Sequence, residues 1–562
     1  MPARPRGEGI ALAGLLAVAA ALFVLPLARL FATGLAGGSG PVLETLRSDA
    51  TRGALLNSLD SASVSALSAL ALGSALAFVI GLTDLRAKGV FVFLLLLPMM
   101  IPPHVTAISW IQALGPSSPV LGWVGLQPKI GVAHPLYSRA GVIALLTLQH
   151  TPLVFLVVLA ALRGLPREMI EAARIAGAGP RRLLRRILLP LLAPSLIAAL
   201  ALAFVSALGN FGIPALLGIP GRYVTLPVLI WRRLAGFGPS VLTDVATLAM
   251  LLAIVAVLAV TLQTWLQRRA RSGLIGPPQP ALRITLGRAR PICEAALALF
   301  VAAVLALPLV SLVATALVPT YGVPLTLESV TWDNFAEVIL RQSAPARAFA
   351  NSTLLAGTAA LVLAGLAALV ALFGARRDRL GRATGTGVAT LAEMSYAIPG
   401  IVISIAFILV YIRPIPGTGL SLYNTLALIL LAYLTAYFAV GLKPVAAAAG
   451  QLDPALDDAA RVAGARFGRR LWRVHLPLLA PAAASGAILV FLTAYNEVTV
   501  SALLWSRGNE TIGTTIFNYE DGGYTTLAAA MASVTVLATV ALMTLLDRLG
   551  RRLPPGVVPW RL

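Results

Sequence analysis

The sequence has 562 residues, of which 58% are apolar and 12% are charged, whereas soluble domains average about 25% charged residues. Lys and Arg number 43 against 22 Asp and Glu, so the net charge is +21. The long apolar stretches argue against a nucleic-acid partner for this charge, because a basic patch needs a water-facing domain. The single cysteine, Cys293, excludes an intrachain disulfide and a cysteine-ligated metal cluster.

Twelve apolar runs are long enough to span a membrane as helices, which takes about 20 residues for a hydrocarbon core about 30 Å thick. They lie near residues 10 to 32, 57 to 82, 90 to 112, 140 to 162, 187 to 209, 241 to 266, 292 to 317, 351 to 373, 386 to 411, 420 to 442, 478 to 504 and 525 to 546. The first run is longer than the apolar core of a signal peptide. The sequence therefore predicts an all-α integral membrane protein with an uncleaved first helix.

Charge predicts the orientation of these spans. When the N terminus is placed in the cytoplasm, the whole surplus of +21 falls on the cytoplasmic loops and tails. Basic residues accumulate on the cytoplasmic side of membrane proteins. We therefore predict that both termini are cytoplasmic.

An internal repeat divides the chain. Residues 165–194 align with residues 452–481 at a constant offset, which places Gly177 on Gly464 and Pro190 on Pro477. Six spans in each half give the two halves the same direction across the membrane, so the repeat is parallel. The predicted organisation is an N-terminal tail 1–9, a first half 10–266, a linker 267–290, a second half 291–547 and a C-terminal tail 548–562.

The repeated loop, at 165–190 and 452–477, has the pattern of a short helix. In the first copy Pro166 and Glu168 precede an alanine-rich surface, and Gly177 follows it. Early Pro and acidic residues are typical of a helix N terminus, and Gly is typical of its end. One interpretation is an interfacial segment that anchors to lipid. Its recurrence in both halves favours a specific docking element instead.

The loop residues resemble the EAA loop of permease subunits of bacterial ABC importers. The matching positions are Glu171, Ala172, Ala173 and Gly177 in the first copy and Asp458, Ala459, Ala460 and Gly464 in the second, where Asp replaces Glu. The resemblance implies a multi-pass protein of the bacterial inner membrane whose two coupling helices bind a homodimer of cytoplasmic ATPase subunits. It also implies an extracytoplasmic substrate-binding protein as a partner, with membrane lipid around the spans and no nucleic acid.

The chain has no ATP-binding site of its own in its sequence. A Walker A loop needs Gly-Lys before Ser or Thr, and Lys88, Lys129 and Lys443 each follow another residue. We therefore expect a transport subunit that is not itself an enzyme and binds no cofactor, with ATP and Mg²⁺ held by the partner ATPase.

A second class of transporter shares the plan of six plus six spans. Residues 374–382 fit the G-x-x-x-D-R-x-G-R loop of the major facilitator type, although the counterpart at 81–89 fits poorly. Such a loop is compositionally common, because a short cytoplasmic turn favours Gly and Arg. The importer interpretation remains the better one, and a plain channel is a weaker alternative.

Polar residues inside the spans are candidates for the substrate path, since burying them in lipid is costly. The candidates are Glu393, Tyr396, Tyr495, Asn496, Glu497 and Asn210. The alternative is that such residues only hydrogen-bond between helices, which we expect of His150. We predict no stable metal site.

The run from Tyr495 to Tyr524, together with residues 209–218, resembles the fused two-half permeases of ferric-iron importers. Hard cations prefer oxygen ligands, which the acidic and tyrosine candidates could supply. Permeases for thiamine, polyamines and phosphonates share the same plan and stay open as alternatives. The polar loop 506–524 is expected to face the binding protein, or else to be an ordinary solvated loop.

Overall fold

The computed structural model describes residues 6–129, 131–165, 167–236, 238, 240–270, 284–375, 379–415, 417–453, 455–550, 552 and 557. Much of the predicted linker 267–290 and most of the C-terminal tail 548–562 therefore lie outside the described residues. The same is true of residues 1–5 in the N-terminal tail and of Arg376, Arg377 and Asp378 in the G-x-x-x-D-R-x-G-R motif.

Helices form nearly all of the regular structure in the described ranges. The first half contains α1 (Arg6–Ala19), η1 (Ala20–Val24), α2 (Leu25–Leu35), α3 (Ser39–Arg47), α4 (Asp49–Leu82), α5 (Lys88–Met100), α6 (Pro103–Leu114), α7 (Pro119–Trp123), α8 (Arg139–Arg163), α9 (Arg167–Ile175), α10 (Pro180–Leu183), η2 (Leu184–Leu188), α11 (Leu189–Leu208), η3 (Pro214–Gly218), α12 (Leu226–Leu234) and α13 (Val241–Arg269).

The second half repeats this order. It contains η4 (Gly287–Ala289), α14 (Arg290–Val301), η5 (Ala302–Ala306), α15 (Leu307–Ala316), α16 (Asp333–Ala336), η6 (Glu337–Arg341), α17 (Ser343–Gly374), α18 (Arg379–Ala397), α19 (Gly400–Tyr411), α20 (Leu426–Ala449), α21 (Ala455–Val462), α22 (Phe467–Arg470), η7 (Leu471–His475), α23 (Leu476–Tyr495), α24 (Ser501–Leu504), α25 (Ile512–Asp521) and α26 (Thr525–Gly550).

Ten helices in the described part of the chain are long and apolar enough to cross a membrane, and up to twelve if each of two bent pairs counts as one span. This confirms the prediction of an all-α membrane protein with about twelve spans. The predicted eleventh run, 478 to 504, is shorter as a helix, because α23 ends at Tyr495 and a turn leads into α24.

The two bent pairs occupy the third span of each half. Helices α5 and α6 meet at 102°, and α18 and α19 meet at 111°. Pro102 and Pro399 lie at the two breaks and have extended backbone, with ψ of 141° and 140°. Proline has no N–H to continue a helix and disfavours helical geometry in the residue before it, which explains both breaks.

The span after each repeated loop begins with the same irregular turn. The N–H of Leu189 bonds to the carbonyl of Leu184, and the N–H of Leu476 bonds to that of Leu471. Each is a five-residue π-helical spacing immediately before Pro190 or Pro477 in the chain. The sequence repeat is therefore also a repeat of backbone geometry.

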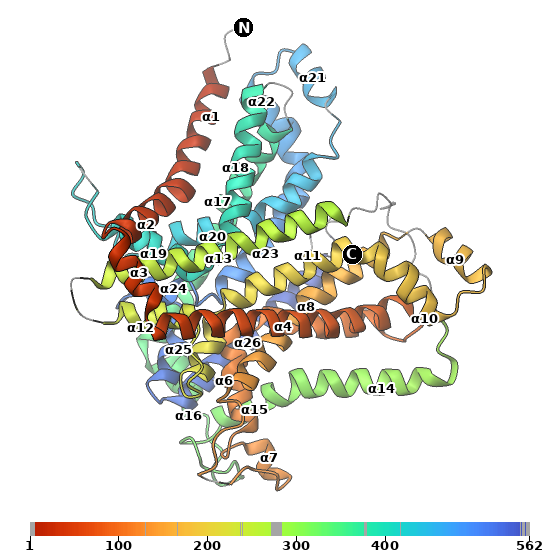
Figure 1. Cartoon of the computed structure of the whole chain (residues 1–562), viewed down its shortest axis with the longest axis vertical. Coiled ribbons are helices and arrows are strands. Elements are labelled where there is room, and N and C mark those ends of the chain that lie inside the picture. Colours follow the sequence, from red (N-terminus) through yellow and green to blue (C-terminus); the bar gives the residue numbers. More distant parts are fainter. Residues whose placement is uncertain are drawn as a thin grey trace.

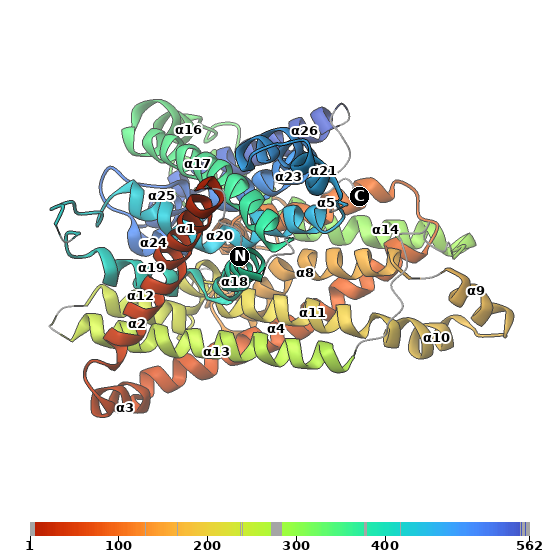
Figure 2. The ribbon, with the colours of Figure 1, turned by 90° about the horizontal axis from the view of Figure 1, so that it is seen from above.

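The first helix of each half packs against the other half. Helices α1 and α2 run beside α18, α19 and α20, where the rings of Phe23 and Phe438 lie 5.4 Å apart and Thr435 donates to the carbonyl of Leu22 at 3.1 Å (Figure 1). In the same way α14 lies along first-half helices, packing on α5 (Figure 2). This exchange ties the two halves into one body.

Candidate functional site

The two repeated loops fold alike around their glycines. Gly177 and Gly464 have φ of +79° and +75°, the left-handed conformation that favours glycine at a helix end. Past each glycine the chain turns back, so that Ala178 N–H donates to the Ala173 carbonyl at 2.9 Å, and Ala465 N–H donates to the Ala460 carbonyl at 3.0 Å. The alanine and glycine of the E-A-A-x3-G pattern thus form the terminating turn of α9 and α21.

Each loop helix ends on an exposed apolar side chain. Ile175 is 89% exposed and Val462 is 90% exposed, and these two residues occupy the same repeat position. Glu171, Ala172, Asp458 and Ala459 are also exposed. In Figure 1, α21 lies at the top and α9 at the right edge, and both are away from α7 and α16 in the lower part of the view. The loops therefore present two similar small surfaces on the side of the molecule away from α7 and α16, which we call the loop end.

A cavity of about 600 Å³ lies between the halves. It is lined by the two helix breaks, by α8, α11 and α13 of the first half, and by α18, α20 and α23 of the second. Five of the six predicted path residues line it: Asn210, Glu393, Tyr396, Asn496 and Glu497. The sixth, Tyr495, is not among the lining residues and stacks on Phe491 with ring centroids 5.3 Å apart.

One acidic and one basic side chain are exposed in this cavity. Glu393 on α18 and Lys443 on α20 both line it and are both exposed. The Lys443 ammonium lies 4.9 Å from the centre of the Tyr396 ring, within the range of a cation–π contact. From the sequence, Lys443 entered only as a lysine that does not fit a Walker A loop. Its position beside Pro444 at the end of an apolar span was the available signal.

Glu497 has a backbone role that its sequence does not reveal. Its carboxylate accepts the N–H groups of Val500 at 2.5 Å and Ser501 at 3.0 Å, at the start of α24. Asn210, at the same repeat position, accepts the N–H of Ile213 at 3.2 Å before η3. Both side chains thus cap the short helix that follows the fifth span of their half.

The other polar residues near the cavity bond between helices. Asn496 donates to the Thr539 hydroxyl at 3.1 Å. The Nε2 of His150 lies 3.0 Å from the Ser206 hydroxyl on α11, which confirms the expected bond between helices, and its Nδ1 lies 2.7 Å from the Leu146 carbonyl in its own helix. Among the described residues, no group of three or more His, Cys, Asp or Glu side chains is placed to hold a metal ion.

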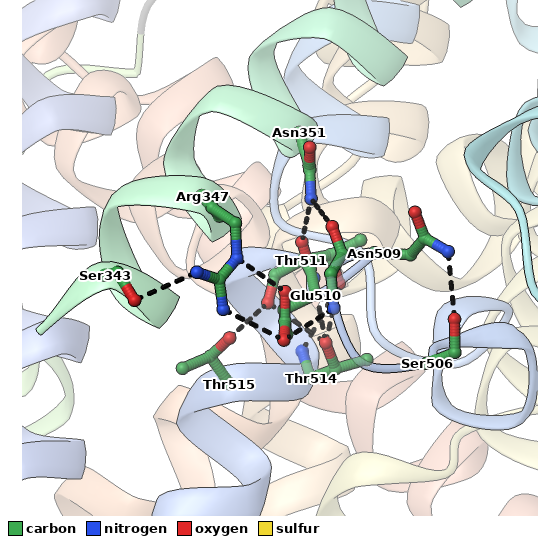
Figure 3. Close-up of polar contacts among 10 residues, drawn as sticks. Ser343, Arg347, Asn351, Ser506, Asn509, Glu510, Thr511, Thr514 and Thr515 are labelled. Carbon is green, nitrogen blue, oxygen red and sulfur yellow. Dashed lines mark hydrogen bonds and ion pairs between the residues drawn. The ribbon is translucent and has the colours of Figure 1, made fainter.

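The polar loop at the opposite end is bonded to its surroundings. Figure 3 shows Arg347 between Ser343 and Glu510, with its Nε and Nη2 each 3.4 Å from a Glu510 carboxylate oxygen. The same carboxylate accepts the Gly508 N–H at 2.9 Å. Although burial raises the pKa of Glu510, these bonds and the Arg347 charge outweigh burial and hold the pKa below its ordinary value. Arg507 remains exposed.

An Asn-Ser pair performs the same task in each half. Asn351 donates to the Glu510 carbonyl at 2.9 Å, and Ser352 accepts the Ile512 N–H at 3.0 Å where α25 begins. The corresponding bonds in the first half join Asn57 to the Val224 carbonyl at 3.0 Å and Ser58 to the Leu226 N–H at 2.7 Å where α12 begins. Each pair fixes a short helix to the top of the second span.

Comparison with known proteins gives the family. Residues 69–272 and 361–558 each match the family "Binding-protein-dependent transport system inner membrane component". A probable ABC transporter permease of Sinorhizobium fredii is 26% identical over 549 residues, which cover 95% of this chain and 93% of that protein. The ferric transport system permease FbpB of Actinobacillus pleuropneumoniae is 24% identical over 84% of this chain and 68% of its own length.

Another relative matches one half only. A probable molybdenum ABC transporter permease of Haloferax volcanii is 28% identical over 46% of this chain and 91% of its own length. The family match covers most of this chain, once in each half, and replaces the alternative of a major facilitator transporter. The chain therefore belongs to the binding-protein-dependent transport system inner membrane components, as a fused pair of permease domains.

Proposed function

We propose that this chain supplies both permease halves of an ATP-driven importer, with α9 and α21 as the coupling helices that bind two identical ATPase subunits. The observation that carries this proposal is the exposure of Ile175 and Val462 at equivalent positions on two helices of the same geometry. The loop end and both termini are then cytoplasmic. An extracytoplasmic binding protein delivers cargo at the opposite end, near the loop that contains Arg507.

The ATPase subunits supply the energy and hold ATP and Mg²⁺. Closure of the ATPase dimer moves α9 and α21, and the connected spans α11 and α23 carry that movement to the cavity between the halves. The bent third spans α5–α6 and α18–α19 place backbone breaks at the cavity wall, where irregular backbone is tolerated in a membrane protein. This chain acts as the transport subunit.

Ferric iron is the cargo we propose. Support comes from the relatives: the ferric permease FbpB aligns across both halves, whereas the molybdenum permease aligns with one. Glu393, Tyr396 and Asn210 offer oxygen atoms to a hard cation passing through the cavity. An oxyanion is the second candidate, favoured by the exposed ammonium of Lys443 in the same cavity. Thiamine and polyamines are weaker alternatives, because Lys443 would repel both.

Reconstitution tests both parts of the proposal. The full chain is incorporated into vesicles with the ATPase, and binding proteins loaded with ferric iron or molybdate are compared for stimulation of ATP hydrolysis and uptake. We expect Ile175→Asp and Val462→Asp each to weaken ATPase co-purification. Undiminished co-purification in the double variant would refute docking at the loops, and stimulation by molybdate alone would replace iron with an oxyanion.

A further inference from the structure

The second repeated loop is joined to the N-terminal helix by buried charges. Arg470, at the end of α22, is 6% exposed, and its Nη2 donates to the carboxylate of Glu8 on α1 at 2.7 Å. The Nε of the same guanidinium lies 3.3 Å from the carboxylate of Asp457 on α21. One side chain thus bridges α1 and the loop helix α21.

Asp457 is the centre of this cluster. Its carboxylate also lies 3.0 Å from the Arg461 Nε and 3.0 Å from the Nε2 of His475, where the following span begins. Burial raises the pKa of Asp457, but the His475 hydrogen bond and the charges of Arg470 and Arg461 together hold the pKa below its ordinary value. The carboxylate therefore stays ionised at neutral pH.

Three charged or titratable positions of this cluster are apolar in the first loop, whereas Arg174 matches Arg461. Ile170, Leu183 and Leu188 stand where the second copy has Asp457, Arg470 and His475. Leu183 and Leu188 are 4% and 2% exposed and belong to an apolar cluster of mainly first-half residues that also includes Leu297 of α14. Apolar contact is non-directional, whereas the charge-assisted hydrogen bonds from Arg470 to Glu8 and between His475 and Asp457 fix distance and orientation. The Arg470 Nε and Asp457 form an ion pair without hydrogen-bond geometry. The two loops have the same backbone conformation, but charged contacts hold the second loop to its neighbours and apolar contacts hold the first.

Helix α1 connects this cluster to the wall of the cavity. It packs against α18, which carries Glu393 and Tyr396, and its continuation α2 packs against α19 beyond the break at Pro399. Removing one partner from a buried ion pair leaves the other charge poorly compensated, so the Glu8–Arg470 contact resists separation of α1 from α22. A movement of α21 is therefore resisted or followed by α1.

We propose that Glu8, Arg470 and Asp457 are positioning residues that lock coupling helix α21 to α1, making the second loop the stiffer of the two points at which the ATPase acts. The inference rests on the proposed function, because it assumes that α9 and α21 bind ATPase subunits. The groups identified do not touch cargo.

The first test measures coupling in the reconstituted full chain with its ATPase and binding protein. We expect Glu8→Gln to lower cargo moved per ATP hydrolysed about tenfold while the ATPase still co-purifies. Glu294→Gln is the matched control, since Glu294 lies on the other exchanged helix α14 and accepts the Arg86 N–H at 2.7 Å. Wild-type coupling in Glu8→Gln would overturn the proposal.

Transferring the apolar residues of the first loop to the second tests whether the charged residues position α21 or only stabilise the fold. The quadruple variant Glu8→Leu, Asp457→Ile, Arg470→Leu and His475→Leu gives the second loop the apolar set of the first. We expect it to assemble with the ATPase but to remain poorly coupled, because the directional bonds are gone. Full coupling in this variant would show that any well-packed contact suffices and would refute the lock.

A distance measurement needs no ATPase. Spin labels are placed at Ile10 on α1, which is 74% exposed, and at Arg469 on α22, also exposed, in a Cys293→Ser background. We expect one narrow distance distribution in the otherwise unchanged chain and a broad one with Glu8→Gln. An unchanged distribution would overturn the lock itself, whereas failure of the wild-type chain to bind an ATPase would overturn only the proposed function.

Discussion

Asn210 and Glu497 occupy the same repeat position, and each side chain accepts backbone N–H groups of the short helix that follows it. An amide in one half and a carboxylate in the other thus perform one structural task. Both also line the cavity between the halves. This dual position makes it possible to separate capping from any contact with cargo.

Glu497→Asn and Glu497→Leu should behave differently. Leucine leaves two buried N–H groups without a partner, which costs about 1–3 kcal/mol, whereas asparagine reproduces the cap of the first half. We expect the thermal midpoint in detergent and the uptake rate to fall in Glu497→Leu and to stay near wild type in Glu497→Asn. Loss of uptake in Glu497→Asn at an unchanged midpoint would show that the carboxylate acts on cargo.

Valine at Gly177 or Gly464 should uncouple ATP hydrolysis from uptake. A Cβ at either position meets no atom within 4 Å, so the penalty is conformational and amounts to about 1–2 kcal/mol. We expect the amount of cargo taken up per ATP hydrolysed to fall in both variants, because the loop helix can no longer end at its turn. Gly468→Ala is the control, since it lies in α22, has equal space and no positive φ. Normal uptake in both valine variants would contradict coupling through these loops.

Glu393 and Lys443 should have opposite effects on uptake. With a cationic cargo, we expect Glu393→Gln to lower uptake about tenfold and Lys443→Met to leave it unchanged or raise it, because only the first removes attraction. An oxyanion cargo would give the reverse order. Initial uptake rates in vesicles measure both, and the amount of ATPase that co-purifies serves as the control for assembly. An equal loss of uptake in the two variants would exclude a purely electrostatic role for Glu393 and Lys443.

The stability of the opposite end should depend on Glu520. Burial raises the pKa of this carboxyl from 4.5 to about 7 in the folded chain, in spite of a bond to Thr525. Because the folded pKa is the higher one, the stabilisation from the bound proton is fully present below about pH 4.5 and is lost as the pH rises through about 7. We expect the thermal midpoint to fall between about pH 5 and about pH 8 relative to that of Glu520→Gln. Parallel pH profiles for the two proteins would contradict the shifted pKa.

The Asn-Ser pairs should stabilise the folded chain by similar amounts in the two halves. Asn57→Ala removes the bond to the Val224 carbonyl, and Asn351→Ala removes those to Gly508 and Glu510. We expect each to destabilise the chain by about 1 kcal/mol, measured as a lower thermal midpoint. Thr261→Ala is a suitable control, because that exposed hydroxyl bonds only within its own helix at 2.8 Å. A midpoint equal to that of the control would refute a stabilising role.

Local patterns in the sequence predicted the long helices and the repeated loops. Apolar runs bounded by charge became the spans, and Gly177 and Gly464 ended their helices as expected. The bends at Pro102 and Pro399 were less predictable, because proline alone does not set an angle of 102° or 111°. Both helices of each bent pair are apolar, so a search for apolar runs reads them as one continuous span and does not reveal the bend.

Long-range pairings could not be predicted from the sequence. Glu8 and Arg470 lie 462 positions apart, so no short stretch of sequence examined for a local pattern contains both residues. Glu497 shows the related difficulty within a short segment: its carboxylate was predicted to line a path, and only the turn before α24 reveals two backbone donors for it. In both cases the partner is chosen by tertiary geometry.

The exchange of first helices also has a consequence for biogenesis. Helices α1 and α2 leave the ribosome first, yet their partners α18, α19 and α20 begin only at Arg379. During translation the faces of α1 and α2 that contact α18, α19 and α20 remain in lipid until these helices are inserted, whereas α2 can pack on α13 of its own half earlier. If the chain were cut between the halves, each fragment would carry a first helix that packs against helices of the other fragment. Fusion guarantees that both fragments arrive together, in equal number, in the same patch of membrane.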